Sequence, residues 1–397
     1  MSRLLCIGNG RVVLPHRVIP NGAVVVRDGH IEAVLENPTN QSCCELLDAQ
    51  GGIIMPGFID MHLHGGGGAD FMDGTLDSFR TIARTHLIHG TTAMTPTTMT
   101  APDEEVEMLI DTYHQVKREG TEGAQFLGLH MEGPYFSSVS KGAQPISSER
   151  TPDLSYVKRI LELGKGEIRR WDAAPELPGM EAFASFLKSQ GILVSLAHSN
   201  ATAQEAEDAF GWGFSHVTHF YNAVTTFRKI RGRVYAGIVE AAYIHDEVTI
   251  ELIGDGRHIP RQSMLLAYQI KGASQIALIT DAMRAAGTNN SASVLGSIVS
   301  GVPVVVDDGV AQLLDRSSYA GSIGTMDLAL RVAHLEYGIP LQDVSLMLSL
   351  TPARLCGVEK EKGSLEKGKD ADVVVLDDKF TVRHALVKGV VRYSAES

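Results

Sequence analysis

Two kinds of segment alternate along the sequence between residues 57 and 280. Short, mostly apolar segments have the composition of buried strands, and most are separated by segments with the periodicity of an amphipathic helix. We expect strands at 57–62, 92–95, 126–130, 168–173, 193–198, 215–219, 248–253 and 276–280, and helices at 76–89, 104–119, 180–190 and 202–211. Strands that alternate with helices form parallel βα units, so the pattern predicts an α/β fold with a (β/α)8 barrel of TIM type.

Side chains able to bind a metal or move a proton stand at or just after five of these strand ends. They are His62, His64, Glu132, His198, His219 and Asp281. Barrel enzymes carry their catalytic residues at the C-terminal ends of the strands, so we expect these six side chains to meet. Two of the histidines are two positions apart and face the same side of a strand. Such a pair alone is weak evidence, because two buried histidines near a strand end explain it equally well.

Both ends of the chain differ from the middle. The N-terminal part contains the hairpin signal Asp28-Gly29 between β-like segments, and 371–376 and 383–391 are also β-like. A barrel needs roughly 250–300 residues, which leaves a smaller domain in a chain of 397. We therefore expect residues 56–356 to form the barrel, and residues 1–55 and 357–397 to pair into one small β-sandwich domain.

Charge and hydropathy exclude several classes of partner. The net charge of −12 argues against binding to nucleic acid or an anionic membrane. No apolar run approaches the ~18 residues of a membrane span, and polar residues interrupt the N-terminal segment where a signal peptide would be apolar. We expect a cytoplasmic protein with a small-molecule partner. Its four cysteines, Cys6, Cys43, Cys44 and Cys356, are expected to be reduced thiols.

Several motifs resemble one superfamily over nearly the whole length. His62-Leu63-His64 and the tail at 363–372 resemble the amidohydrolase superfamily in general. His-Met-Glu-Gly-Pro at 130–134 and His-Phe-Tyr-Asn-Ala at 219–223 resemble, within it, the N-acetylglucosamine-6-phosphate deacetylase family. The resemblance implies hydrolysis of the acetyl group of an amino-sugar phosphate, in amino-sugar catabolism or cell-wall recycling.

The resemblance also assigns roles to the six strand-end residues. Glu132, His198 and His219 would hold the main metal ion, a donor set that suits Zn²⁺ or Fe²⁺. The remaining two histidines, at 62 and 64, would hold a second ion with Glu132 as the bridge. The alternative is a single metal ion, with these two histidines lying behind its ligands without binding the ion themselves. Asp281 would accept a proton from metal-activated water and return it to the leaving amine, although it could instead cap a helix.

Phosphate recognition follows from the same resemblance. It would use the Asn222 side chain, the backbone amides of Asn222 and Ala223, His258, and an arginine. In the family this arginine usually precedes Pro-Gly, which is absent here; Arg231 is the better match and Arg228 the alternative. Either arginine could instead be a solvated loop charge.

Gln144 stands where many members of the family have a histidine that polarises the acetyl carbonyl. A glutamine can donate a hydrogen bond to that oxygen without carrying charge, or it can contact a sugar hydroxyl. The resemblance further implies a homodimer, with His258 or the arginine reaching the partner's site.

Three other functions are open at this point. A ring-opening amidohydrolase of the dihydroorotase type usually bridges its metals with a lysine on the fourth strand, but 169–176 contains none. A nucleobase deaminase of the same fold is disfavoured by the deacetylase-like segments at 130–144 and 218–223. A non-enzymatic scaffold is disfavoured because every expected ligand is present. Sequence does not distinguish a glucosamine from a galactosamine substrate.

Overall fold

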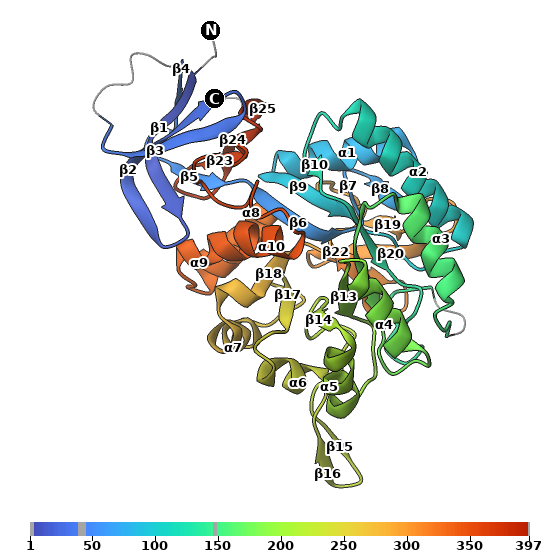
Figure 1. The fold of residues 1–397 in the computed structure, drawn as a ribbon. Helices are drawn as coiled ribbons and strands as arrows, with labels where there is room; N and C mark the ends of the chain where they lie inside the picture. The colour runs from blue at the N-terminus through green and yellow to red at the C-terminus, as the bar shows by residue number, and fades with distance from the viewer. Residues whose placement is uncertain (1–3, 39–44, 146–148, 396–397) are drawn as a thin grey trace.

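The computed structural model describes residues 4–38, 45–145 and 149–395 (Figure 1). Its centre consists of parallel strands in two sheets, with the orders β10-β9-β6 and β11-β12-β13-β14-β17-β18. Their bounds are β6 Phe58–Leu63, β9 Thr91–Pro96, β10 Gln125–Phe126, β11 Leu129–Glu132, β12 Ile168–Ala173, β13 Leu193–Leu196, β14 Phe214–Val217, β17 Thr249–Ile253 and β18 Ile276–Ile279. All eight predicted strands are confirmed, the third being divided into β10 and β11.

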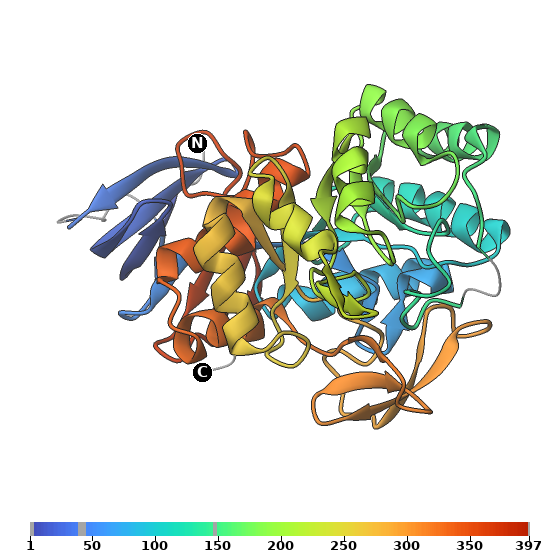
Figure 2. The ribbon, with the colours of Figure 1, turned by 90° about the horizontal axis from the view of Figure 1, so that it is seen from below.

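Helices lie around the parallel strands (Figures 1 and 2). They are α1 Leu76–Leu87, α2 Asp103–Glu119, α3 Leu154–Gly164, α4 Met180–Ser189, α5 Ala203–Trp212, α6 Ile238–Ile244, α7 Arg261–Lys271, α8 Met326–Arg331, α9 Leu341–Ser345 and α10 Thr351–Leu355. Local sequence sets where two of them begin. The hydroxyls of Thr75 and Thr202 accept the backbone N–H of the residue three positions later, and each contact is reciprocated in a capping box. The four predicted helices correspond to α1, α2, α4 and α5.

Two isolated parallel bridges connect the two sheets. One joins Thr97 to His130 and the other joins Leu63 to Ala282. The bridges are supported by backbone hydrogen bonds, from Thr98 N–H to the His130 carbonyl (3.0 Å) and from His64 N–H to the Ala282 carbonyl (2.8 Å). They bring the C-terminal ends of β6, β9, β11 and β18 to one face of the molecule.

Strands from both ends of the chain share one eight-stranded sheet. Its order is β25-β24-β23-β5-β1-β2-β3, with β4 paired to β1. The bounds are β1 Leu4–Leu14, β2 Arg17–Arg27, β3 His30–Glu36, β4 Glu45–Asp48, β5 Ile53–Pro56, β23 Val373–Leu376, β24 Val382–Val387 and β25 Val390–Ser394. The predicted turn at Asp28-Gly29 joins β2 to β3, with both residues at positive φ. The predicted pairing of the two termini is therefore confirmed. Hydrogen bonds connect the strands of both termini in one continuous order. Cys43 and Cys44 lie outside the described residues.

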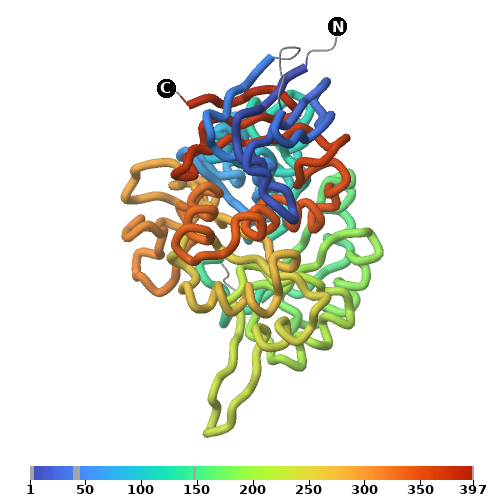
Figure 3. Tube along the Cα trace, turned by 90° about the vertical axis from the view of Figure 1, so that its left-hand side faces the viewer, coloured from blue at the N-terminus to red at the C-terminus, as the bar shows by residue number. Residues whose placement is uncertain are grey.

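Three antiparallel elements were not predicted, the smallest being the pair β7 (Gly65–Gly66) and β8 (Ala69–Asp70). A four-stranded sheet follows β18 and lies at one side of the body (Figure 2); its strands are β19 Ala292–Leu295, β20 Val302–Asp307, β21 Val310–Leu313 and β22 Tyr319–Ser322. A hairpin of β15 (Arg228–Ile230) and β16 (Arg233–Tyr235) projects far from the body (Figure 3). Among the described residues, no helix has both the length and the apolar character needed to cross a membrane.

Candidate active site

The six strand-end residues converge as predicted. His62 lies on β6 and Glu132 ends β11, while the others follow β6, β13, β14 and β18 within two residues. All six are buried: His62, His64, Glu132, His198, His219 and Asp281 expose between 0% and 8% of their surface. They lie at or next to a pocket of about 400 Å³, which is large enough for a sugar phosphate.

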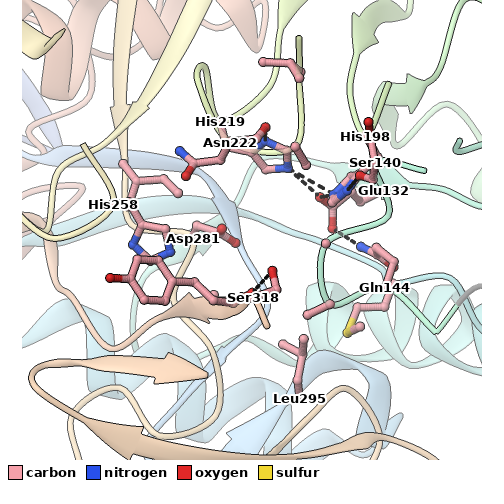
Figure 4. Close-up of a pocket in the computed structure, with 18 of the residues that line it drawn as sticks. Glu132, Ser140, Gln144, His198, His219, Asn222, His258, Asp281, Leu295 and Ser318 are labelled. Carbon is pink, nitrogen blue, oxygen red and sulfur yellow. Dashed lines mark hydrogen bonds and ion pairs between the residues drawn. The ribbon is translucent and has the colours of Figure 1, made fainter. Parts of the chain in front are cut away.

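Glu132, His198 and His219 form the first ion group. Glu132 Oε1 is 3.2 Å from His198 Nε2 and 3.3 Å from His219 Nε2, and the two imidazole nitrogens are 3.1 Å apart (Figure 4). Two atoms bound tetrahedrally to Zn²⁺ at about 2.0–2.1 Å are about 3.3 Å from each other. The spacing of the three ligand atoms therefore fits one ion.

Hydrogen bonds on the far side of each imidazole prepare it as a ligand. His198 Nδ1 is 3.2 Å from the Ser140 carbonyl oxygen, and His219 Nδ1 is 3.0 Å from the Asn222 carbonyl oxygen. A carbonyl only accepts, so each Nδ1 carries the proton and each Nε2 presents a lone pair to the centre.

His62, His64 and Glu132 form the second ion group. His64 Nε2 is 3.3 Å from Glu132 Oε2, and His62 Nε2 is 3.6 Å from Glu132 Oε1. The buried His62 Nε2 has no hydrogen-bond partner among the described residues, which is a costly state for an imidazole that binds nothing. Glu132 belongs to both groups, and its two oxygens point in different directions. The structure thus contains two overlapping groups able to hold a divalent metal.

Asp281 adjoins the second ion group. Its Oδ1 lies 3.5 Å from His62 Nε2 and 3.4 Å from His64 Nε2. Burial alone would raise the pKa of this carboxyl, but the neighbouring His62 and His64 imidazoles lower it below its usual range. For Glu132, close contacts with the His198 and His219 imidazoles likewise outweigh burial and hold its pKa well below the usual range. Both carboxyls are therefore ionised, as a ligand and a proton acceptor must be.

Three of these residues have a backbone conformation that side chains rarely adopt. The φ angles are +44° at His198, +27° at His219 and +49° at Asp281. Such strain costs about 1–3 kcal/mol per residue and persists where the surrounding structure enforces it, most often at functional sites. Backbone hydrogen bonds provide that enforcement at Asp281, from its N–H to the His62 carbonyl (2.9 Å) and to its carbonyl from the Ser322 N–H (2.8 Å).

Comparison with known proteins agrees with this geometry. Residues 53–392 match the model of the amidohydrolase family. The chain is 33% identical to N-acetylglucosamine-6-phosphate deacetylase of Vibrio furnissii over 86% of its length and 83% of the relative. It is 32% identical to that of Bacillus subtilis over 99% of its length and 98% of the relative. The chain belongs to the N-acetylglucosamine-6-phosphate deacetylase family.

Solved structures of the same family are similar to this chain over nearly its whole length. The deacetylase of Pasteurella multocida superposes with a TM-score of 0.91 at 29% identity, covering 99% of this chain and 100% of the other. An aspartate-to-alanine variant of the Mycobacterium smegmatis deacetylase, in complex with N-acetyl-D-glucosamine-6-phosphate, gives a TM-score of 0.89 at 29% identity with the same coverage. N-acetylgalactosamine-6-phosphate deacetylase of Escherichia coli O157:H7 is also 32% identical, over 92% of this chain and 93% of the relative.

Four of the predicted substrate-binding residues of this deacetylase family member line the pocket: Gln144, Asn222, Ala223 and His258. The His258 ring is held by Asp255, whose Oδ2 is 2.7 Å from Nδ1, so His258 Nε2 is the atom left for a ligand. The Asn222 backbone N–H already donates to the His219 carbonyl (2.9 Å).

Gln144 spans two neighbours with its amide. Its nitrogen donates to Glu132 Oε2 (2.8 Å; Figure 4). Its oxygen accepts the Thr100 backbone N–H (3.0 Å). A primary amide has two N–H groups, so one remains for a substrate oxygen. Contact between Gln144 and the acetyl carbonyl stays a prediction.

The structure does not bring the predicted arginine to the pocket. Arg231 is exposed at the tip of the β15–β16 hairpin, which points away from the body (Figure 3). Arg228, at the base of the hairpin, donates to Asn200 Oδ1 (2.8 Å). Neither arginine lines the pocket of its own chain.

Proposed function

We propose that this protein removes the acetyl group from N-acetylglucosamine 6-phosphate, giving glucosamine 6-phosphate and acetate, in cytoplasmic amino-sugar catabolism or cell-wall recycling. The observation that carries the proposal is the first ion group, whose ligand atoms have tetrahedral spacing and which shares one sugar-sized pocket with Asp281. The relatives that match most of this chain are deacetylases of this kind by name.

The chain's own residues divide the work of amide hydrolysis. A divalent ion, when bound, polarises a carbonyl and makes water more acidic. Glu132, His198 and His219 would hold Zn²⁺ or Fe²⁺, and His62 and His64 a second ion bridged by Glu132.

Asp281 would take the proton from the attacking water and return it to the amine nitrogen, because an amine leaves only when protonated. Gln144 would donate its remaining N–H to the carbonyl oxygen as negative charge develops there. Both residues line the same pocket, so each can reach one bound amide.

Phosphate binding is assigned to other residues that line the same pocket. The Asn222 side chain, the Ala223 backbone N–H and His258 Nε2 are the proposed donors. We place Arg231 in the phosphate site of a partner subunit in a homodimer, because the exposed hairpin carries it away from its own pocket. The hairpin also exposes the apolar side chains that an interface would cover: Ile230, Val234 and Tyr235, next to Phe227.

For the fold, we infer that the two parallel sheets are parts of one (β/α)8 barrel at 56–356, closed by the bridges Thr97–His130 and Leu63–Ala282. The terminal sheet has a hydrophobic core of its own, which includes Val12, Ile54 and Val373. This core supports a small β-sandwich domain built from 1–55 and 357–397.

Acetate release at defined metal loading tests the proposal. The panel consists of N-acetylglucosamine 6-phosphate, its galactosamine epimer and unphosphorylated N-acetylglucosamine. We expect strong preference for a phosphorylated sugar; equal kcat/KM for the sugar with and without phosphate would refute the phosphate site. The galactosamine epimer belongs in the panel because a relative that acts on it is equally similar.

The dimer is tested separately. Arg231→Ala should reduce kcat/KM for the phosphorylated sugar, while mixing it with an Asp281→Asn chain should restore part of the activity if the arginine acts across subunits. Loss on Arg228→Ala instead would move the assignment to that residue, and a monomer by light scattering at assay concentration would refute the shared site.

A further inference from the structure

One buried carboxylate outside the pocket contacts both ion groups. Glu251 lies in the middle of β17 and is fully buried. Its Oε2 is 3.1 Å from His62 Nδ1 and accepts the backbone N–H of His219 at 3.2 Å. The same oxygen accepts a third hydrogen bond, from Arg170 Nη2 at 3.1 Å. A single carboxylate oxygen thus joins a side chain of the second ion group to the backbone of the first.

Glu251 is itself held in place by a buried ion-pair network. Arg170, on β12, donates through Nη1 to Glu251 Oε1 and through Nε to Asp172 Oδ1 (2.8 Å). The Thr218 hydroxyl accepts from Arg170 Nη2 (2.6 Å) and donates to Asp172 Oδ2 (2.7 Å). Buried charges with full sets of partners are costly to rearrange, so the network fixes the position of the carboxylate.

The contact with His62 decides which nitrogen of that imidazole can bind an ion. A carboxylate only accepts hydrogen bonds, so the proton of neutral His62 resides on Nδ1. Nε2 then presents a lone pair in the direction of Glu132 Oε1 (3.6 Å) and Asp281 Oδ1 (3.5 Å). Partners of this kind orient a ligating histidine and typically change metal affinity by about 10–100-fold.

We propose that Glu251 is a positioning residue that fixes His62 Nε2 as a ligand atom and thereby sets the affinity of the second ion group for its divalent metal. The proposal rests on the two-ion site of the proposed function. It does not require that the substrate be an amino-sugar phosphate, because the contact between Glu251 and His62 is present without any substrate.

Two variants of Glu251 test it, with ion content as the readout. Glu251→Asp keeps the charge that Arg170 needs but withdraws the carboxylate by about 1.5 Å, one carbon–carbon bond. Glu251→Gln keeps the shape but replaces one acceptor oxygen with a donor. Asp172→Asn is the matched control, because it removes a buried charge from the same network while Arg170 keeps its direct contacts with Glu251, and because Asp172 touches no candidate ligand.

Chelator competition and elemental analysis give the number of ions per chain and the affinity of each. We expect both Glu251 variants to bind the second ion about 10–100-fold more weakly than the wild type, and the control to stay within threefold. Thermal unfolding of each metal-loaded protein identifies a variant that does not fold. If one Glu251 variant does not fold, the second-ion affinity of the other tests the proposal.

Three results would overturn the proposal: unchanged second-ion affinity in the folded Glu251 variants, an equal loss in Asp172→Asn, or a wild-type chain that binds only one ion at saturation. Failure of the proposed function is a separate result, visible as absence of acetate release by the fully loaded wild type whatever its ion count.

Discussion

Replacing Asp281 by asparagine should separate catalysis from metal binding and folding. Of the described residues that line the pocket, only Glu132 and Asp281 carry a carboxyl group. Both oxygens of Glu132 are engaged, by His198 and His219 on one side and by Gln144 and His64 on the other. Asp281 is therefore the carboxylate left to carry a proton between water and the leaving amine.

The expected loss of turnover follows from that role. General acid–base catalysis contributes roughly 10²–10⁴-fold, which is about 2.7–5.4 kcal/mol of transition-state stabilisation. Asparagine has nearly the same shape and cannot exchange the proton. It also tolerates the positive φ of this position, and the backbone hydrogen bonds to His62 and Ser322 do not involve the side chain. We expect the fold and the ion at the first ion group to persist.

Acetate release at saturating substrate, elemental analysis and the thermal midpoint measure these three properties. Asp308→Asn is a matched control, because Asp308 has the same φ of +49° but is exposed in the turn between β20 and β21. Turnover of Asp281→Asn within threefold of the wild type, at equal metal content, would show that another group moves the proton.

Three further changes have distinct signatures. Glu132→Ala should empty both ion groups and abolish acetate release, because this carboxylate belongs to each of them; full metal content by elemental analysis would contradict the assignment. Asn222→Ala should lower kcat/KM for the phosphorylated sugar by about 10–150-fold, from the 1.5–3 kcal/mol of one charge-assisted hydrogen bond, and leave the unphosphorylated sugar nearly unchanged in the same steady-state assay. Lys362→Ala should destabilise the fold by about 3–5 kcal/mol in urea titration, because it removes the buried cation that lies 2.7 Å from Asp370 and 2.6 Å from Asp372. The exposed Lys367→Ala is its control, and equal stability of the two variants would be the contrary result.

The convergence of the six strand-end residues could be predicted because it depends on short-range rules. Alternation along a strand puts His62 and His64 on one side, and parallel strands end at one face. The positive φ angles at His198 and His219 could not be predicted, because they are enforced by hydrogen bonds to distant segments, such as the contact of the Ser199 N–H with the Ala223 carbonyl (3.0 Å).

For other features, the local sequence predicts an element or a buried charge but not its position in the fold. Val302–Asp307 followed by Asp308-Gly309 is a hairpin signal, yet nothing in it says that these strands leave the parallel sheets. Charged residues inside strand segments, such as Arg170 and Glu251, are a signal of buried partners. Which partners they have depends on pairing between strands far apart in sequence, and the orientation of the hairpin that carries Arg231 is likewise a tertiary property.

The shared terminal sheet has a consequence for biosynthesis. β23 pairs with β5, residue by residue from Val373 with Pro56 to Leu376 with Ile53, and one residue separates β5 from β6, the strand of His62. In a chain synthesised from its N-terminus, β5 can pair early with β1 but lacks its second neighbour, β23, until translation has nearly ended. Premature termination near the C-terminus should therefore impair metal loading at residues that the ribosome finished long before.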